Sequence, residues 1–405
     1  MKNFSWKNNT VTHMHIELSN YCNAACPFCP RFVDSTALVR PDLKMDSITI
    51  DQFKDWFPPE FMKNIERILF CGTHGDPMMC KDIIEITEYI QKTSPYCTII
   101  YHTNGGMRKP DFWKKLGQLL SKNQNLYRVI FSIDGLEDTN HLYRRNVKWS
   151  TLMENVNSYI NAGGSAVWEF LTFGHNEHQI EEATKLSEDL GFHKILIKRA
   201  LGFENKNGNL VSKGIYDKKG NLEYVIEPPN DKELINSSKS EKIKNSIPQK
   251  KDLSYADNNT PGVNQQVLSK LDNFNETEIS DFNKYVLNFE DYEINCKSCT
   301  DRGTSEIYVS CNGIVFPCCY VGTRVDSAID LYEDTQLRYS INKVGKEKFD
   351  LAQTNIFEII QNGYLDQVYT ESWKKKQITL GKLAYCAMTC GKNSEIDRIY
   401  SDDRY

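Results

Sequence analysis

Three cysteines stand close together near the start of the chain, in the stretch ELSNYCNAACPFCPR. Cys22, Cys26 and Cys29 have the spacing C-x3-C-x2-C. Three thiolates on one tight loop can hold three irons of a cubane cluster and leave the fourth iron open to an outside ligand. A structural zinc ion would need a fourth protein ligand, for which His13 or His15 is available in the sequence. The spacing favours an iron–sulfur cluster over zinc.

The composition is that of an acidic globular protein. The chain has 405 residues, of which 40% are hydrophobic and 25% charged, and its net charge is −5. Negative charge argues against nucleic acid as the main partner, because phosphate binding needs a basic surface. No apolar run reaches the roughly 18 residues of a membrane span, and the N-terminus lacks an apolar signal core. We therefore expect a cytoplasmic protein, in which thirteen cysteines indicate metal rather than disulfides.

Strand-like and helix-like stretches alternate between residues 13 and 200. The predicted strands are HMHIEL, RILFCG, CTIIYHT, RVIFSID, AVWEFLTF and KILIKRA, each rich in β-branched and aromatic residues. The predicted helices between them cover 81–92, 110–122, 150–161 and 178–190. NAGG at 161–164 and Gly191 read as helix stops. This alternation indicates an α/β fold with a parallel sheet built from βαβ units.

The second half of the chain changes character. Residues 202–295 are crowded with polar and charged residues, and 235–262 is polar enough to be partly disordered or a long insertion. YDKKGNLEYVIEPP predicts a hairpin that turns at 219–221, and IYVSCNGIVFPCCY predicts another around 312–313. A helix is predicted around 355–369.

The cysteine loop after the first strand of a βα series resembles the radical S-adenosylmethionine (radical SAM) superfamily. This resemblance implies a partial (β/α)6 TIM-like barrel over 1–201. Cys22, Cys26 and Cys29 would be the catalytic ligands of a 4Fe–4S cluster whose open iron chelates SAM. Reductive cleavage of SAM would give a 5′-deoxyadenosyl radical that abstracts a substrate hydrogen. The electron would come from an external one-electron reductant of the flavodoxin or ferredoxin type.

Further motifs follow the next strands in the order that this family shows. CGTHGDP is similar to the family's Gly-Gly-Glu-Pro, with Asp where Glu is common, and HTNGG is similar to Thr-Asn-Gly. FSIDGLEDTNHLYRR is similar to the family's Ser-x-Asp followed by Arg. Taken singly, each such residue is more often a turn residue or a solvated charge; together they imply a SAM pocket. Its predicted contacts are Phe28 (adenine), Gly75, Asp76 and Pro77 (amino group), Asn104 (pocket rim), Ser132 and Asp134 (methionine or ribose), and Arg145 or Arg144 (carboxylate).

The remaining cysteines concentrate between 296 and 390. Cys299, Gly313 and Cys318 form C-x13-G-x4-C, which is similar to family members with an auxiliary cluster in a C-terminal SPASM or twitch extension. With Cys386 and Cys390 this resemblance implies one auxiliary 4Fe–4S cluster in a smaller domain over 296–405, joined to the barrel by a polar bridging region over 202–295. The rival of Cys299 is Cys296. The other cysteines read as small buried apolar residues: Cys71, Cys80, Cys97, Cys311 and Cys319.

The function implied is that of a radical SAM oxidoreductase or maturase, and we expect its substrate to be a ribosomal peptide or protein. About 14 residues precede the first strand, so we expect any leader-binding domain to be a separate protein. Two alternatives stay open. One is a radical SAM dehydrogenase or other modifier of a small metabolite such as a sugar or aminocyclitol. The other is a non-catalytic iron–sulfur or zinc protein that serves as an electron carrier or scaffold.

Overall fold

The computed structural model describes two compact units. The described residues are 4–41, 43–203, 209–234, 245–251, 253, 293–294, 296, 305–325, 332–376 and 381–391. The larger unit comprises Glu17–Ile50 and Ile68–Asp257, and the smaller comprises Met1–Ile16, Asp51–Arg67 and Asn258–Tyr405. The domain boundaries expected at 201 and 295 stay a prediction.

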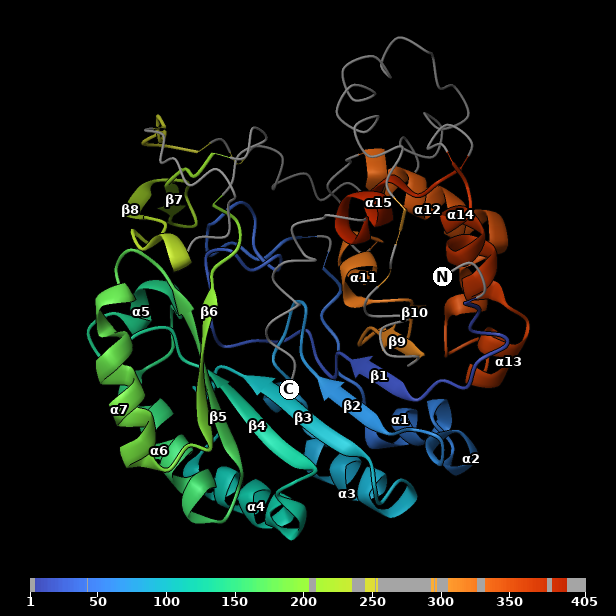
Figure 1. Ribbon diagram of the computed structural model, residues 1–405, viewed down its shortest axis with the longest axis horizontal. Helices are drawn as coiled ribbons and strands as arrows, with labels where there is room; N and C mark the ends of the chain where they lie inside the picture. The colour runs from blue at the N-terminus through green and yellow to red at the C-terminus, as the bar shows by residue number, and fades with distance from the viewer. Residues whose placement is uncertain are drawn as a thin grey trace. The chain divides into compact units, whose positions relative to one another are not determined.

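Strands and helices alternate through the larger unit. In chain order they are β2 (Arg67–Phe70), η1 (Pro77–Met79), α3 (Ile83–Thr93), β3 (Thr98–Thr103), α4 (Pro110–Leu120), η2 (Ser121–Asn123), β4 (Tyr127–Ser132), α5 (Asn140–Tyr143), α6 (Trp149–Asn161), β5 (Ala166–Thr172), η3 (Glu177–Gln179), α7 (Ile180–Leu190) and β6 (Lys194–Arg199). Strands β2 to β6 are neighbours in chain order, and the pairs from β3 to β6 are parallel (Figure 1). With β1, the six predicted strands are confirmed, and so is the α/β class.

The core of this unit lies between the sheet and its helices. Helix α4 buries Trp113, Leu116 and Leu120 on one face, because residues three to four apart share a side of a helix. The indole of Trp113 donates to the carbonyl of Met107 at 2.9 Å, so its polar atom is satisfied inside the core. Helix α7 ends at Gly191, whose φ of 83° is left-handed and favours glycine, as predicted.

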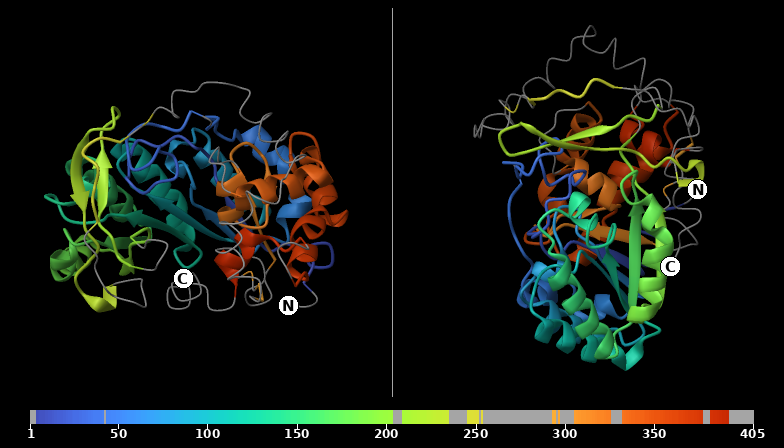
Figure 2. Two further views of the ribbon diagram at one scale, coloured as in Figure 1. Left: turned by 90° about the horizontal axis from the view of Figure 1, so that it is seen from above. Right: turned by 90° about the vertical axis from the view of Figure 1, so that its left-hand side faces the viewer.

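A two-stranded hairpin stands at the carboxyl end of the parallel strands (Figures 1 and 2). Strands β7 (Lys213–Tyr216) and β8 (Leu222–Ile226) pair antiparallel, and a short turn η4 (Lys232–Leu234) follows. Gly220 has a φ of 81°, which confirms the predicted hairpin and its turn. The Tyr224 hydroxyl donates to the Leu142 carbonyl at 2.7 Å, and Gly174 N donates to the Glu227 carbonyl at 2.9 Å. The hairpin therefore packs on the loops that follow β4 and β5.

The smaller unit joins the first strand to a hairpin from the far end of the chain. Strand β1 (His13–Ile16) pairs parallel with β9 (Glu306–Val309), and β9 pairs antiparallel with β10 (Val315–Phe316). Gly313, with a φ of 82°, turns this hairpin as predicted. The helices of this unit are α1 (Ile50–Trp56), α2 (Pro59–Met62), α11 (Cys319–Val325), α12 (Tyr332–Val344), η7 (Lys346–Phe349), α13 (Ile356–Gln361), the π-helix η8 (Asp366–Thr370), α14 (Glu371–Trp373) and α15 (Ala384–Cys390).

One predicted helix of this unit is interrupted. The helix expected around 355–369 stops at Gln361, and Gly363 takes a left-handed φ of 68° before the chain resumes as η8. The buried Trp6 holds η8 in place, because its backbone N donates to the Asp366 carboxylate at 3.1 Å. Within the described part of the chain, no helix combines the length and the apolar character that crossing a membrane requires.

Candidate active site

The loop 17–31 carries the three predicted cluster cysteines, of which Cys26 is buried and Cys22 and Cys29 are half-buried. Burial is the largest cause that raises the pKa of each thiol, and it brings that of Cys29 to about 12. The charge of Cys26 also raises the pKa values of Cys22 and Cys29, and such an effect requires that the sulfurs lie near one another. The charges of these three predicted ligands therefore act on one another, as expected of cysteines on one loop.

Two side chains direct N–H groups at these sulfurs. Asn104 Nδ2 lies 3.6 Å from Cys22 Sγ, and Arg144 Nη1 lies 3.7 Å from Cys26 Sγ. Donors to sulfur stabilise a thiolate relative to a thiol and orient it. Three grouped thiols with N–H donors on two of them fit an iron–sulfur cluster, whose irons need thiolate ligands.

The carboxylate of Asp76 is enclosed by donors from its own chain. It is 3% exposed and caps η1, which begins at Pro77, by accepting from Met78 N at 3.0 Å. It also accepts from the Thr103 hydroxyl at 2.9 Å and from Asn104 N and Nδ2 at 2.9 and 3.0 Å. Burial raises the pKa of Asp76 to about 6, although these donors act in the opposite direction. Asp76 therefore fixes the Asn104 side chain that reaches Cys22.

Asp134 forms a buried ion pair at the end of β4. Its carboxylate accepts from Arg144 Nε at 2.6 Å and from Leu171 N at 2.7 Å, and its side chain is 0% exposed. Burial raises the pKa of Asp134, and the Arg144 charge acts against that rise. The pair fixes the guanidinium that contacts Cys26. Of the two arginines weighed from the sequence, Arg144 is thus the one whose side chain reaches a cysteine of the loop.

Arg145 points to the hairpin instead. Its Nη2 contacts the Glu223 carboxylate, and its guanidinium lies 5.9 Å from the centre of the Tyr224 ring. Its Nη1 is buried and has no hydrogen-bond partner in the structure, so one donor of this arginine is available to a ligand. The Arg145 carbonyl accepts from Ala25 N at 2.9 Å, which attaches the cysteine loop to this segment.

Phe28 and Ser132 complete the predicted pocket residues. The Phe28 ring packs edge-on against Tyr143, Phe173 and Phe203 at centroid distances of 5.7, 6.2 and 5.4 Å. This aromatic cluster anchors the loop between Cys26 and Cys29. Ser132 is the last residue of β4 and is 8% exposed.

Glu17 belongs to the site and escaped the sequence reasoning. It is 1% exposed, and its Oε1 accepts from His74 N at 2.7 Å and Gly75 N at 3.0 Å. A Cβ added at Gly75 would lie 1.9 Å from the Ser19 carbonyl oxygen, so this turn packs directly on the cysteine loop. The signal was an acidic residue at the C-terminal end of a strand, where sites of parallel α/β folds gather.

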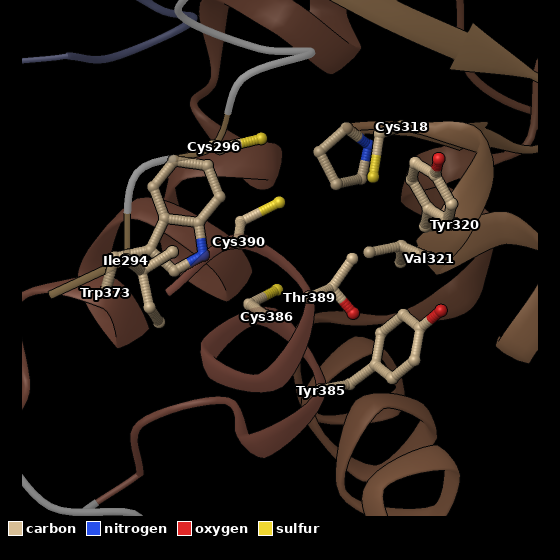
Figure 3. Close-up of a pocket in the computed structure, with 11 residues that line it drawn as sticks. Ile294, Cys296, Cys318, Tyr320, Val321, Trp373, Tyr385, Cys386, Thr389 and Cys390 are labelled. Atoms are coloured by element: carbon tan, nitrogen blue, oxygen red, sulfur yellow. The ribbon is translucent and has the colours of Figure 1, made fainter. Parts of the chain in front are cut away.

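A second group of cysteines lines a pocket in the smaller unit (Figure 3). Cys386 and Cys390 lie four residues apart on α15, so they share one face of that helix. Cys318 directly precedes α11, and the three sulfurs point toward a common centre. Burial raises the pKa of Cys318 and brings that of Cys386 to about 12; Cys390 raises both further. Three of the four predicted auxiliary ligands are thus brought together.

The fourth auxiliary ligand involves Cys296 and Cys299. Cys299 lies outside the described residues, whereas Cys296 lines the pocket and is disulfide-bonded in this structure.

The hydroxyl of the fully buried Tyr369 has no hydrogen-bond partner in the structure, and Cys386 and Cys318 are near enough to raise its pKa beyond the effect of burial. Nowhere in the described ranges do three or more His, Cys, Asp or Glu side chains surround a point for a single metal ion.

The model of the radical SAM superfamily matches residues 16–187. This chain carries a radical SAM domain. The match contains the cysteine loop and the motifs that follow β2, β3 and β4. Proteins of this superfamily are enzymes that use a 4Fe–4S cluster and SAM, so these are the cofactors of the domain.

Three solved structures illustrate the proteins to which the chain is similar. Streptococcus suis SuiB bound to S-adenosylmethionine shares 13% identity over 77% of this chain and 61% of SuiB, with a TM-score of 0.41. Native anSMEcpe with bound AdoMet and Cp18Cys peptide shares 13% identity over 98% of this chain and 92% of its own, with a TM-score of 0.45. BtrN in complex with AdoMet and 2-DOIA shares 19% identity over 31% and 46%, with a TM-score of 0.25. The chain thus spans about three fifths of SuiB. No curated protein matches the sequence.

Proposed function

We propose that this protein cleaves SAM reductively and uses the resulting 5′-deoxyadenosyl radical to abstract a hydrogen atom from a peptide or protein substrate, as a radical SAM oxidoreductase or maturase. The observation that carries the proposal is the cysteine loop 17–31, in which Cys26 is buried, Cys22 and Cys29 are half-buried, and N–H donors reach the sulfurs of Cys22 and Cys26. A 4Fe–4S cluster bound there supplies the electron for SAM cleavage.

Cys22, Cys26 and Cys29 hold the cluster in this proposal, and Asn104 and Arg144 orient two of the three sulfurs. Because Asp76 is already enclosed by internal donors, its part is to hold Asn104 and η1 in place.

The proposal keeps several of the SAM contacts that the sequence predicts. The backbone carbonyls of Gly75 and Pro77 accept hydrogen bonds from the SAM amino group. Ser132 lies beside the methionine or ribose of SAM. The buried, unpartnered Nη1 of Arg145 supports the assignment of that residue to the SAM carboxylate. Phe28 offers its backbone to adenine while its ring anchors the loop.

An auxiliary 4Fe–4S cluster belongs to the proposal as well. Cys318, Cys386 and Cys390 line one pocket of the smaller unit. Cys299 is the proposed fourth ligand. Cys296 would replace it only after its disulfide is reduced, because a ligand must be a thiolate. The Tyr369 hydroxyl, buried without a hydrogen-bond partner, is near enough to Cys386 and Cys318 for their charges to raise its pKa, so a thiolate there is a suitable acceptor for it.

A peptide suits the larger unit because of its terminal strand. Strand β6 is the last in the strand order, so its outer edge has no partner among the described strands. An extended peptide can add to such an edge by main-chain hydrogen bonds. All six residues of β6 keep part of their surface exposed; Lys198 is already paired with Glu169 at 2.9 Å, and Arg199 is the most exposed residue of the strand and would favour an acidic peptide.

Anaerobic reconstitution tests the proposal. Wild-type protein given iron, sulfide, SAM and dithionite should release 5′-deoxyadenosine, and a Cys22→Ala/Cys26→Ala/Cys29→Ala variant should release none. Zinc at these thiols, or a cluster that leaves SAM intact, would refute the reaction and favour a carrier or scaffold. Deuterium transfer into 5′-deoxyadenosine from labelled acidic peptides, compared with labelled sugars and aminocyclitols, would distinguish the two substrate classes.

A further inference from the structure

Arg31 is a buried cation at the end of the cysteine loop, two residues after Cys29. The residue is 7% exposed. Its Nη1 donates to the Asn20 carbonyl, and its Nε is buried without a hydrogen-bond partner. No carboxylate forms an ion pair with it within the part of the chain that the structure describes. Since a buried charge without a counter-charge destabilises a fold, this arginine calls for a negative partner.

The other arginine beside the loop is different. Arg144 also directs an N–H at a cysteine, but its charge is balanced by Asp134 at 2.6 Å. Glu17 is the carboxylate whose charge reaches Cys29, yet its Oε1 accepts from the turn at His74 and its Oε2 lies 3.8 Å from the imidazole Nδ1. Arg31 is therefore the buried cation of this loop with which no carboxylate pairs within the described residues.

The charge of Arg31 already acts on a cluster ligand. Burial, the largest cause, raises the pKa of the Cys29 thiol to about 12, whereas Arg31 acts to lower it through its backbone N–H and its charge. A thiolate at Cys29 is thus favoured by this cation. Guanidinium stays protonated at every pH that a protein tolerates, so its effect is constant.

We propose that Arg31 is the fixed positive charge that eases one-electron reduction of the cluster held by Cys22, Cys26 and Cys29. The inference rests on the proposed radical SAM function. The electron comes from the external one-electron reductant and adds one negative charge among three thiolates. A buried cation without a counter-ion stabilises that added charge and so raises the reduction potential.

Potentiometric titration of the anaerobic holoenzyme tests this proposal. The reduced cluster is followed by its electron paramagnetic resonance signal and is identified by the change of that signal when SAM is added. Arg31→Gln should be at least tenfold less reduced at the wild-type midpoint, which corresponds to about 59 mV for a one-electron couple. Arg31→Lys should stay within about half of that shift. Arg128→Gln, at the far end of β4, is the matched control and should behave as wild type.

An unchanged midpoint in Arg31→Gln would overturn the inference, and so would an equal shift in Arg128→Gln. Loss of SAM affinity with an unchanged midpoint would overturn it too, because Arg31 would then be a SAM ligand. If Arg31→Gln binds too little iron to titrate, Arg31→Met provides a second neutral variant, and Arg31→Lys must still match wild type. Absence of any SAM-responsive signal in wild type would refute the proposed function, whereas a normal signal with no Arg31 effect refutes only this inference.

Discussion

The ion pair between Asp134 and Arg144 allows a sharp prediction about stability. The Arg144→Met substitution leaves a carboxylate that is 0% exposed with only Leu171 N as a donor. The folded protein then has its lowest free energy when Asp134 is protonated. Taking up that proton costs about 1.36 kcal/mol for each pH unit above the unfolded pKa of about 3.9. The expected loss is therefore at most about 4 kcal/mol at pH 7 and at most about 1.5 kcal/mol at pH 5, because wild-type Asp134 already bears part of the cost of burial.

Urea unfolding of the cluster-free protein, followed by circular dichroism at pH 5, 6 and 7, measures this loss. An Asp134→Asn/Arg144→Met double variant should recover the pH-dependent part, because Asn keeps an acceptor for Leu171 N and carries no charge. The reasoning fails if Arg144→Met loses the same free energy at pH 5 and pH 7. It also fails if the double variant is no more stable at pH 7 than Arg144→Met alone.

Three further predictions concern Gly75, His175 and Cys318. Gly75→Ala would place a Cβ 1.9 Å from the Ser19 carbonyl oxygen, so calorimetry should show at least tenfold weaker SAM binding; unchanged affinity would contradict that packing. Burial lowers the pKa of His175 to about 4, so its contribution to stability is present above pH 6.5 and is lost as the pH falls through 4. His175→Phe keeps the stacking on Phe173, and between pH 7 and pH 4.5 it should lose about 2 kcal/mol less than wild type in urea unfolding; equal losses would speak against it. Cys318→Ser should remove about four irons per chain in iron analysis and leave the SAM-responsive cluster in place; wild-type iron content would exclude Cys318 as a ligand.

Local signals in the sequence were sufficient for the elements of the fold. The alternation of strands and helices and the two hairpins with their glycine turns were predicted, because strand propensity, helical spacing and left-handed glycines act over short stretches. The parallel pairing of β1 with β9 was not predicted, because the short stretches HMHI and EIYV contain no signal that specifies which distant strand each one pairs with.

The sequence singled out many residues near the cysteine loop, but it did not predict what each side chain contacts. The spacing of the cysteine loop found its three thiols, but two adjacent arginines could not be told apart. The loop turns Arg144 toward Cys26 and Arg145 toward Glu223, and only tertiary structure sets these directions. Likewise, the donors that enclose Asp76 follow two different strands, β2 and β3. The stretch CGTHGDP alone therefore does not show that Asp76 positions Asn104.

The partnership of β1 and β9 has a consequence for how the chain matures on the ribosome. Residues His13–Ile16 emerge first, yet Glu306–Val309 follow roughly 290 residues later. At about 5 to 20 residues per second, the opening strand waits about 15 to 60 s for that neighbour. During this interval β1 can pair only with β2, so the strand that leads into the cysteine loop is flanked on both sides only late in synthesis.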